Sequence, residues 1–187
     1  SPTYSVMYVS YLATMRAMED SIIISIASIN DAETIRNIYN HEVLNSTASF
    51  DLVERTVEEQ RIWLSERSGA FSVLVAEVEN KVMGFASLSP FNKKDGYRTT
   101  VENSVYVDPA ARGLGIGSKL LDEILLVATR SGFHAVIARI GGGNDTSIAL
   151  HEKHGFFLVG VEREVGRKFG RWQDVVVMQK ILSAESS

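Results

Sequence analysis

Short apolar runs alternate with amphipathic stretches along most of the chain, and this pattern is typical of a domain that mixes strands and helices. Runs rich in β-branched and aromatic residues predict strands at residues 22–26, 71–78, 82–88, 99–107, 135–140, 156–161 and 174–181. Helical spacing of apolar residues predicts helices over residues 32–44, 56–69, 116–132 and 145–153. The order β-α-α-β-β-β-α-β-α-β-β indicates an α/β or α+β layered fold rather than a repeat or a bundle.

Local turn and capping signals support these boundaries. Asn30 and Asp31 are side chains that cap exposed helix amides, and Asn144 or Asp145 does the same for the last helix. Residues 79–81 form a polar break of hairpin length between two strands. The clearest helix follows a glycine-rich turn, and its apolar residues share one face: Leu120, Leu121, Ile124, Leu125 and Ala128.

Composition narrows the class of protein. The chain has 187 residues, of which 45% are hydrophobic and 22% charged, so we expect a single folded domain over residues 21–183. Its lack of cysteine excludes a disulfide framework and thiolate metal ligands. A net charge of −4 without a basic stripe argues against a nucleic-acid partner.

Residues 1–20 contain scattered apolar residues but no basic leader followed by a continuous apolar run. We treat them as an N-terminal extension whose role the composition does not decide. No window approaches the roughly 18 apolar residues that a membrane span needs. These patterns predict a cytoplasmic protein that does not enter a membrane.

The glycine-rich turn over residues 112–118 lies between a predicted strand and the amphipathic helix, where unpaired amides and the helix dipole favour an anion. A P-loop would need a glycine-lysine-serine/threonine ending, which is absent. A dinucleotide turn would need glycine where Ser118 stands. A glycine-rich connection that serves only tight packing stays open, but a phosphate-bearing ligand is the better interpretation.

Two separated motifs resemble the GNAT superfamily of N-acetyltransferases: Arg112-x-x-Gly115-x-Gly117, and Asn144-x-x-Ser147-x-x-Leu150-His151-x-x-x-Gly155-Phe156. The resemblance implies a mixed, mostly antiparallel, twisted sheet flanked by helices on both faces. It also implies acetyl-CoA as co-substrate, with its pyrophosphate on the turn. The residues expected to bind it are Val105, Tyr106, Val107, Arg112, Gly113, Leu114, Gly115, Ile116, Gly117, Ser118, Asn144 and Ser147.

Three further stretches resemble the phosphinothricin and methionine sulfone/sulfoximine acetyltransferase branch of that superfamily: Ile38-Tyr39-Asn40, residues 98–107 and residues 165–174. The resemblance covers about residues 22–182 and implies a homodimer that acetylates the α-amine of a small amino acid. The superfamily at large usually has tyrosine where His151 stands, whereas this branch resembles the chain in having histidine. A tyrosine acid is therefore in doubt.

Catalysis by direct transfer needs a base for the amine, because an α-amine is mostly ammonium at neutral pH. The resemblance assigns this role to Glu102, although a lone carboxylate in a strand also suits a solvent-facing position. His151 is assigned to proton transfer or substrate positioning, against the alternative of a purely structural histidine. A backbone amide within residues 105–107 is the expected oxyanion donor, at a splay in the strand.

Substrate contacts are expected from the polar loop ahead of the catalytic strand, although that loop is equally consistent with a solvated charge cluster. The residues assigned to the substrate are Phe50, Asp95, Gly96, Tyr97, Arg98 and His154. Residues 168–172 are a further candidate wall of that pocket, or else core or subunit contacts. His151 and His154 lack the zinc-protease spacing and a third ligand, so we expect no metal.

Two other functions compete with acetylation of a small amine. One is acetylation of a peptide or protein amine, which needs an open groove. The other is a non-catalytic regulator that binds acetyl-CoA, and the retention of Glu102 and His151 argues against it.

Overall fold

One open sheet organises the protein, whose structure is a computed structural model describing residues 7–9, 11, 13–14 and 21–182. The described strands are β1 (Ile23–Ile26), β2 (Leu74–Val78), β3 (Lys81–Pro90), β4 (Thr100–Val107), β5 (Ala135–Gly141), β6 (Phe157–Lys168) and β7 (Arg171–Ile181). They form a seven-stranded sheet in the order β1-β2-β3-β4-β5-β7-β6. Every neighbouring pair is antiparallel except β4 and β5, which are parallel. The predicted fold class, mixed and mostly antiparallel, is confirmed.

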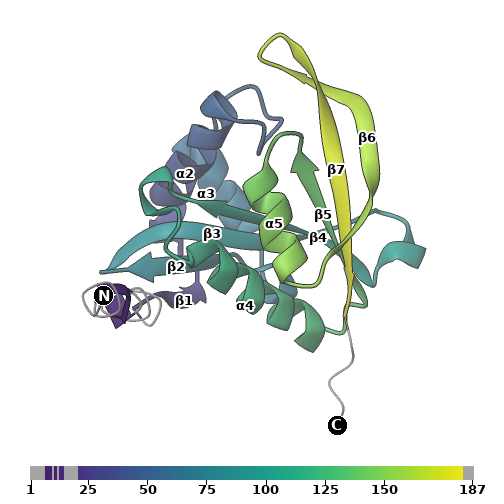
Figure 1. The fold of residues 1–187 in the computed structure, drawn as a ribbon. Helices are drawn as coiled ribbons and strands as arrows, with labels where there is room; N and C mark the ends of the chain where they lie inside the picture. The colour runs from purple at the N-terminus through teal and green to yellow at the C-terminus, as the bar shows by residue number, and fades with distance from the viewer. Residues whose placement is uncertain (1–6, 10, 12, 15–20, 183–187) are drawn as a thin grey trace.

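Helices cover both faces of this sheet, as predicted (Figure 1). The helices are α2 (Ala32–Asn45), α3 (Val57–Ser65), α4 (Ile116–Arg130) and α5 (Asp145–Lys153), with 3-10 turns at Ile29–Asp31, Gly69–Phe71, Asp95–Tyr97 and Pro109–Ala111. In Figure 1, α4 and α5 lie in front of the sheet, and α2 and α3 lie behind it. Each face has its own hydrophobic core cluster.

The helix α4 fixes the larger core and, through it, the glycine-rich turn. All five residues of its predicted apolar face are buried, which confirms that prediction. Burying one leucine side chain contributes about 1.5–3 kcal/mol, so this face anchors the helix firmly. Because α4 begins at Ile116, the turn before it is held at a defined place above the sheet.

The β2–β3 hairpin is also confirmed. Glu79 and Asn80 both have positive φ, at 50° and 61°, which is the conformation of a two-residue turn matched to the twist of its strands. Asparagine tolerates this conformation better than most residues.

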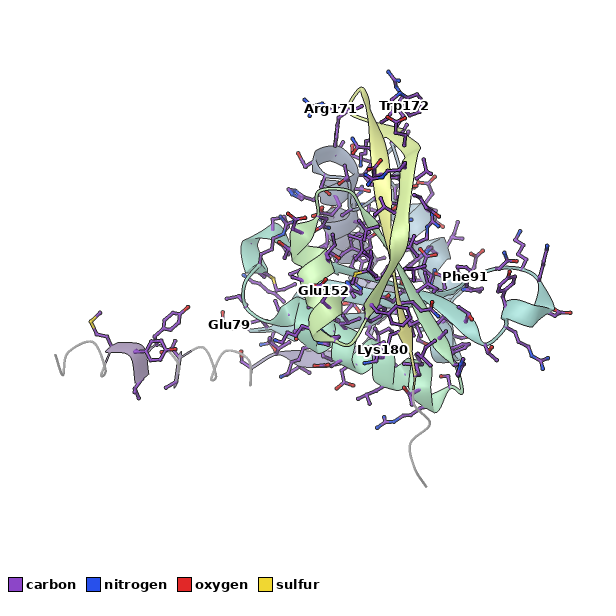
Figure 2. The ribbon with its side chains drawn as sticks, turned by 45° about the vertical axis from the view of Figure 1, so that its right-hand side comes forward. Glu79, Phe91, Glu152, Arg171, Trp172 and Lys180 are labelled. Atoms are coloured by element: carbon purple, nitrogen blue, oxygen red, sulfur yellow. The ribbon has the colours of Figure 1, made fainter. Side chains whose placement is uncertain are left out.

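The last hairpin is longer than the sequence pattern indicated. Strands were predicted over residues 156–161 and 174–181, but β6 and β7 continue pairing until Lys168 faces Arg171. Arg171 and Trp172 lie near the tip of this hairpin (Figure 2). The reason is that residues 162–168 are mostly exposed and polar, so they carry no apolar alternation, while cross-strand hydrogen bonds still hold them.

Two smaller corrections concern boundaries. The helix predicted to reach residue 69 ends at Ser65, and the strand predicted from residue 71 begins at Leu74, because a 3-10 turn lies between them. Most of the predicted extension, residues 1–20, lies outside the described residues. Within the described part of the chain, no helix has the length and apolarity to cross a membrane.

Candidate active site

A gap between β4 and β5 lies at the centre of the candidate site. The two strands pair only from Thr100 with Ala135 to Glu102 with Ile137, although β4 continues to Val107 and β5 to Gly141. Beyond Glu102, the backbone groups of β4 that face β5 have no strand partner in the described sheet. A narrow cleft of about 50 Å³ lies here, lined by both strands and by Asn144, Ser147 and His151. The predicted splay is therefore present in the structure.

A larger cleft of about 540 Å³ adjoins this gap. Its lining combines the loop after α2, the end of β4, the glycine-rich turn and the beginning of α5. The two clefts share Ala48, Val105, Tyr106, Asn144 and Ser147. A single groove therefore leads from the glycine-rich turn into the gap between the strands.

The glycine-rich turn presents the amino end of α4 to the larger cleft. Gly113 and Gly115 have positive φ, at 79° and 83°, which only glycine adopts without strain. Gly115 is the N-cap, and no described side chain caps the first amides of α4. Free amides at a helix amino end bind anions such as phosphate.

Gly117 gives an independent sign that the cleft receives a ligand. It is helical, and a Cβ placed there would make ordinary contacts, at 3.4 Å to Leu150 Cδ2 and 3.5 Å to Val107 Cγ2. Neither backbone conformation nor packing within the chain therefore requires glycine. A glycine at this position leaves the first turn of α4 open to close approach by a ligand such as the predicted pyrophosphate.

Most residues expected to bind the coenzyme lie together along this groove. The ones that line the larger cleft are Val105, Tyr106, Val107, Arg112, Gly113, Gly115, Ile116, Gly117, Ser118, Asn144 and Ser147. Leu114 does not line it and instead packs against the core cluster under α4, so a contact through its side chain is not supported.

Two of these side chains are engaged within the protein. The ring of Tyr106 stacks on Phe85 at 5.1 Å, and its hydroxyl donates to the carbonyl of Ala48. The guanidinium of Arg112 forms an ion pair with the buried carboxylate of Glu42. Both residues therefore shape the cleft wall: Arg112 contacts the end of α2, and Tyr106 contacts the segment that follows it.

Glu102 is partly buried on the face of the sheet opposite α4 and α5. Its neighbours Val101 and Asn103 point toward those helices, and side chains alternate along a strand. Burial raises the pKa of the Glu102 carboxyl, the nearby Arg139 lowers it, and Glu162 raises it. No described residue makes a hydrogen bond to this carboxylate, so it is available to take a proton.

Sequence reasoning missed Arg139, which lines the narrow cleft from β5. Its Nη1 and Nη2 donate to the two carboxylate oxygens of Glu162, at 2.8 and 2.5 Å. Such a bidentate pair fixes the guanidinium in place. No local signal could reveal it, because the partners are far apart in sequence and meet only through the pairing of β5, β7 and β6.

The charges around Glu102 predict opposite shifts in pH dependence. The role of base predicted for Glu102 needs the deprotonated carboxylate, so activity is expected to fall as the pH decreases through the raised pKa of this group. Arg139→Gln removes the group that lowers this pKa, and the acid limb of kcat/KM should move to higher pH. Glu162→Gln removes a group that raises it, and the limb should move to lower pH. Profiles of kcat/KM against pH that shift in the same direction for both variants would contradict this assignment.

His151 lies on the other side of the gap from Glu102. Its ring is buried, with Nδ1 2.7 Å from the carbonyl oxygen of Ser147 and Nε2 3.0 Å from Asn103 Nδ2. Burial lowers the pKa of His151, the Ser147 carbonyl raises it, and His154 lowers it. The two predicted catalytic residues therefore do not meet on one face.

The residues assigned to the substrate are dispersed. Asp95–Tyr97 is an exposed 3-10 turn followed by Arg98, and the ring of Tyr97 lies edge-on to Phe91 at 5.5 Å. Phe91 and this turn project at one side of the molecule (Figure 2). None of the four residues from Asp95 to Arg98 lines either cleft described above. Phe50 packs against Gly166 of β6, where a Cβ would come within 2.5 Å of its ring.

His154 joins two helices and lines neither cleft, which does not support its predicted contact with substrate. Its side chain is buried between α5 and α4, with Nε2 3.1 Å from Ser118 Oγ and 3.2 Å from Asp122 Oδ1. Its Nδ1 lies 2.7 Å from the carbonyl of Leu150. The described residues contain no group of three potential metal ligands.

The end of α2 and the segment after it form a wall of the larger cleft that sequence reasoning did not assign. Glu42, Ser46, Thr47 and Ala48 line the larger cleft. The buried ammonium of Lys168 donates to the carbonyls of Glu42 and Ser49, at 3.2 and 2.6 Å. Burial lowers the pKa of Lys168. This lysine ties the β6–β7 hairpin to the loop over the groove.

Comparisons with known proteins agree with this geometry. The model of the acetyltransferase (GNAT) family matches residues 34–156. An L-methionine sulfoximine/L-methionine sulfone acetyltransferase of Salmonella typhimurium is 42% identical over 152 residues, covering 80% of this chain and 88% of that protein. A phosphinothricin acetyltransferase from Sinorhizobium meliloti in complex with AcCoA superposes with a TM-score of 0.83 at 38% identity, covering 87% and 89% of the two chains. A ribosomal-protein-alanine N-acetyltransferase from Brucella melitensis superposes with a TM-score of 0.84 at 43% identity, covering 86% and 99%.

Proposed function

The chain belongs to the GNAT acetyltransferase family and is an acetyl-CoA-dependent N-acetyltransferase, and from this premise we propose that its acceptor is the α-amine of a small amino acid. The substrate class we propose comprises methionine sulfone, methionine sulfoximine and phosphinothricin. The similarity to relatives named for these compounds supports it over most of the chain.

One observation carries this proposal: the groove from the glycine-rich turn ends at the gap that begins at Glu102. Bound acetyl-CoA supplies an acetyl thioester, and the groove is continuous enough to bring that group to the gap. Glu102 lies beside the gap on the face of the sheet opposite α4 and α5. The amine and the thioester can therefore approach each other from opposite faces of the sheet.

In the proposed mechanism, Glu102 removes a proton from the ammonium of the amino acid, directly or through one water. The neutral amine forms the new C–N bond, the C–S bond breaks, and one of the two remaining amine protons passes to the thiolate while the other stays on the amide nitrogen. Unpaired β4 amides near Val105 stabilise the negative charge on the carbonyl oxygen during this step. Glu102 returns its proton to solvent before the next cycle.

A second candidate function is acetylation of a protein amino terminus. The solved structure titled as a ribosomal-protein-alanine N-acetyltransferase is 43% identical over 86% of this chain, which favours keeping this candidate. A peptide would need to lie along the open face around Glu102, where Arg139 and Glu162 are partly exposed.

The test is an assay of thiol release from acetyl-CoA with a panel of acceptors. We expect release with L-methionine sulfone, L-methionine sulfoximine and phosphinothricin, and no release with peptides that begin with alanine. Release only with peptides would favour the second candidate. Binding of acetyl-CoA without release from any amine would favour a non-catalytic regulator.

We also propose that two copies associate through β6. This strand is at the edge of the sheet, and its residues Phe157, Leu158 and Val159 are 51%, 58% and 54% exposed. An exposed apolar edge strand is a template for pairing with another strand. The same strand of a second copy can pair with it in a symmetric dimer. Since acetyl-CoA is highly charged and crosses membranes poorly, we place the reaction in the cytoplasm.

Val159→Lys is expected to shift the protein from dimer to monomer, because it buries a charge at the centre of the proposed interface. Size-exclusion chromatography with light scattering measures the mass. Leu52→Lys, at a loop residue that is 68% exposed, is the matched control and should leave the mass unchanged. A wild-type monomer at micromolar concentration would contradict the proposed dimer.

A further inference from the structure

Asn103 is a buried polar residue that the mechanism above does not use. It lies on β4, is 5% exposed and lines the narrow cleft. Its Nδ2 is 3.0 Å from Nε2 of His151, while its Oδ1 has no hydrogen-bond partner among the described residues. Buried carbonyl oxygens are rarely left without a donor, so this atom points to a missing ligand group.

The hydrogen bonds of His151 determine which side-chain atom of Asn103, Nδ2 or Oδ1, faces its ring. The carbonyl oxygen of Ser147 can only accept a hydrogen bond, so Nδ1 of His151 must carry a proton. Burial favours the neutral ring, which leaves Nε2 with a lone pair. The group that faces Nε2 must therefore be the NH₂ of Asn103, and its Oδ1 is directed elsewhere.

The surroundings of His151 support a neutral ring. Phe156 packs edge-on at 4.9 Å, Ser147 contributes its carbonyl, and β4 contributes the uncharged Asn103. The titratable neighbour that affects it is His154 at the end of the same helix, and this neighbour lowers the pKa of His151. Both ring nitrogens are thus engaged, so His151 is poorly arranged to give a proton to a thiolate.

Position in the groove identifies the ligand group that Oδ1 would meet. The side chain of Asn103 faces α5, on the side of the sheet where the larger cleft lies, whereas the side chain of Glu102 faces the opposite side. The narrow cleft, which Asn103 lines, is continuous with the larger cleft through Val105, Asn144 and Ser147. The arm of coenzyme A carries two secondary amides, whose N–H groups are the donors that a side-chain carbonyl accepts.

Building on the proposed function, we propose that Asn103 is a positioning residue for the thioester arm: its Oδ1 accepts a hydrogen bond from an arm amide, and neutral His151 holds it in that orientation. His151 then acts through Asn103, in place of the proton transfer that its motif suggested. The pair sets how far the arm enters the gap between β4 and β5.

The first test compares Michaelis constants. Asn103→Leu keeps the approximate volume and removes the acceptor, so the KM for acetyl-CoA is expected to rise about tenfold while the KM for the amino acid stays unchanged. Asn92→Leu makes the same substitution at an exposed loop residue and is the matched control. An unchanged KM for acetyl-CoA, or a rise confined to the amino acid, would overturn the proposal.

His151 variants separate positioning from proton transfer. His151→Gln keeps an acceptor for the Asn103 NH₂ and should raise the KM for acetyl-CoA less than His151→Leu does. Equal losses of kcat in the two variants, with the KM for acetyl-CoA unaffected, would instead indicate an acid and overturn the proposal.

A spectroscopic test on the wild-type protein does not depend on whether a variant folds: nitrogen-15 NMR should show His151 neutral with the proton on Nδ1 at pH 7. A second measurement uses the variant Asn103→Asp, which should raise the pKa of His151 because a carboxylate favours the imidazolium. A wild-type ring protonated on Nε2 would overturn the proposal.

Calorimetric titration with acetyl-CoA separates this proposal from the proposed function. Wild-type binding that is weakened in Asn103→Leu supports the positioning role even if no amine is acetylated, in which case the proposed function alone fails. Turnover with full acetyl-CoA affinity in that variant makes the positioning role fail alone.

Discussion

Glu102→Gln is expected to lower kcat about 10²- to 10⁴-fold, which is the usual contribution of a general base. The glutamine keeps the shape of the side chain but cannot take a proton from the ammonium. The KM for acetyl-CoA should change little, because Glu102 lies on the face opposite α4 and α5 and does not line the coenzyme cleft. Steady-state kinetics with thiol detection measures both quantities.

The thermal stability of Glu102→Gln should not fall with its kcat. Burial raises the pKa of Glu102 above its value in an unfolded chain, so its ionisation disfavours the folded state as the pH rises through these values. Glu102→Gln is therefore expected to have an equal or higher Tm at pH 7, with the difference from wild type shrinking in acid. Glu79→Gln, in the exposed β2–β3 turn, is the control for both measurements. Unchanged kcat in Glu102→Gln would exclude this residue as the base.

Gly117→Ala is expected to raise the KM for acetyl-CoA about 10- to 100-fold without weakening the fold. The added methyl group stands where the pyrophosphate would approach the first turn of α4, and each charge-assisted hydrogen bond lost there is worth about 1.5–3 kcal/mol. Within the protein the methyl meets Leu150 and Val107 only at ordinary contact distance. Alanine also favours a helix over glycine by up to about 1 kcal/mol, so the Tm should not fall.

The matched control for this variant is Gly160→Ala. Gly160 lies in β6, away from the groove, and a Cβ there would meet no atom within 4 Å. Its kinetics should equal those of the wild type. If Gly117→Ala binds acetyl-CoA normally in calorimetric titration, the first turn of α4 is not the pyrophosphate site, and the coenzyme must bind elsewhere in the groove.

The elements predicted best are those whose signals are local. The helix α4 was predicted from its one apolar face, and α5 was predicted from its capping residue Asn144. The β2–β3 hairpin was predicted from its polar turn. These patterns depend on residues within one or two turns of each other. The β6–β7 hairpin was underestimated because its outer part is stabilised by pairing between strands and not by an alternating apolar face.

The candidate site divides in the same way. The turn that lines the larger cleft was identified from its closely spaced glycines at positions 113, 115 and 117. Arg139 and Glu162 were not identified because their pairing depends on the order of the strands in the sheet. The predicted substrate contact of His154 is not supported, because this residue contacts α4 whereas His151 lines the narrow cleft. The role assigned to His151 also depended on Asn103, which only the packing of α5 on β4 brings within reach.

The sequence by itself determined the order of strands and helices and the glycine-rich turn before α4, since periodicity and glycine spacing are properties of neighbouring residues. Only the tertiary structure decided that β4 and β5 separate after Glu102, that Glu102 and His151 lie on opposite faces of the sheet, and that Lys168 holds the loop over the groove. Those facts depend on contacts between residues distant in the chain, and such contacts are set by packing of the whole fold.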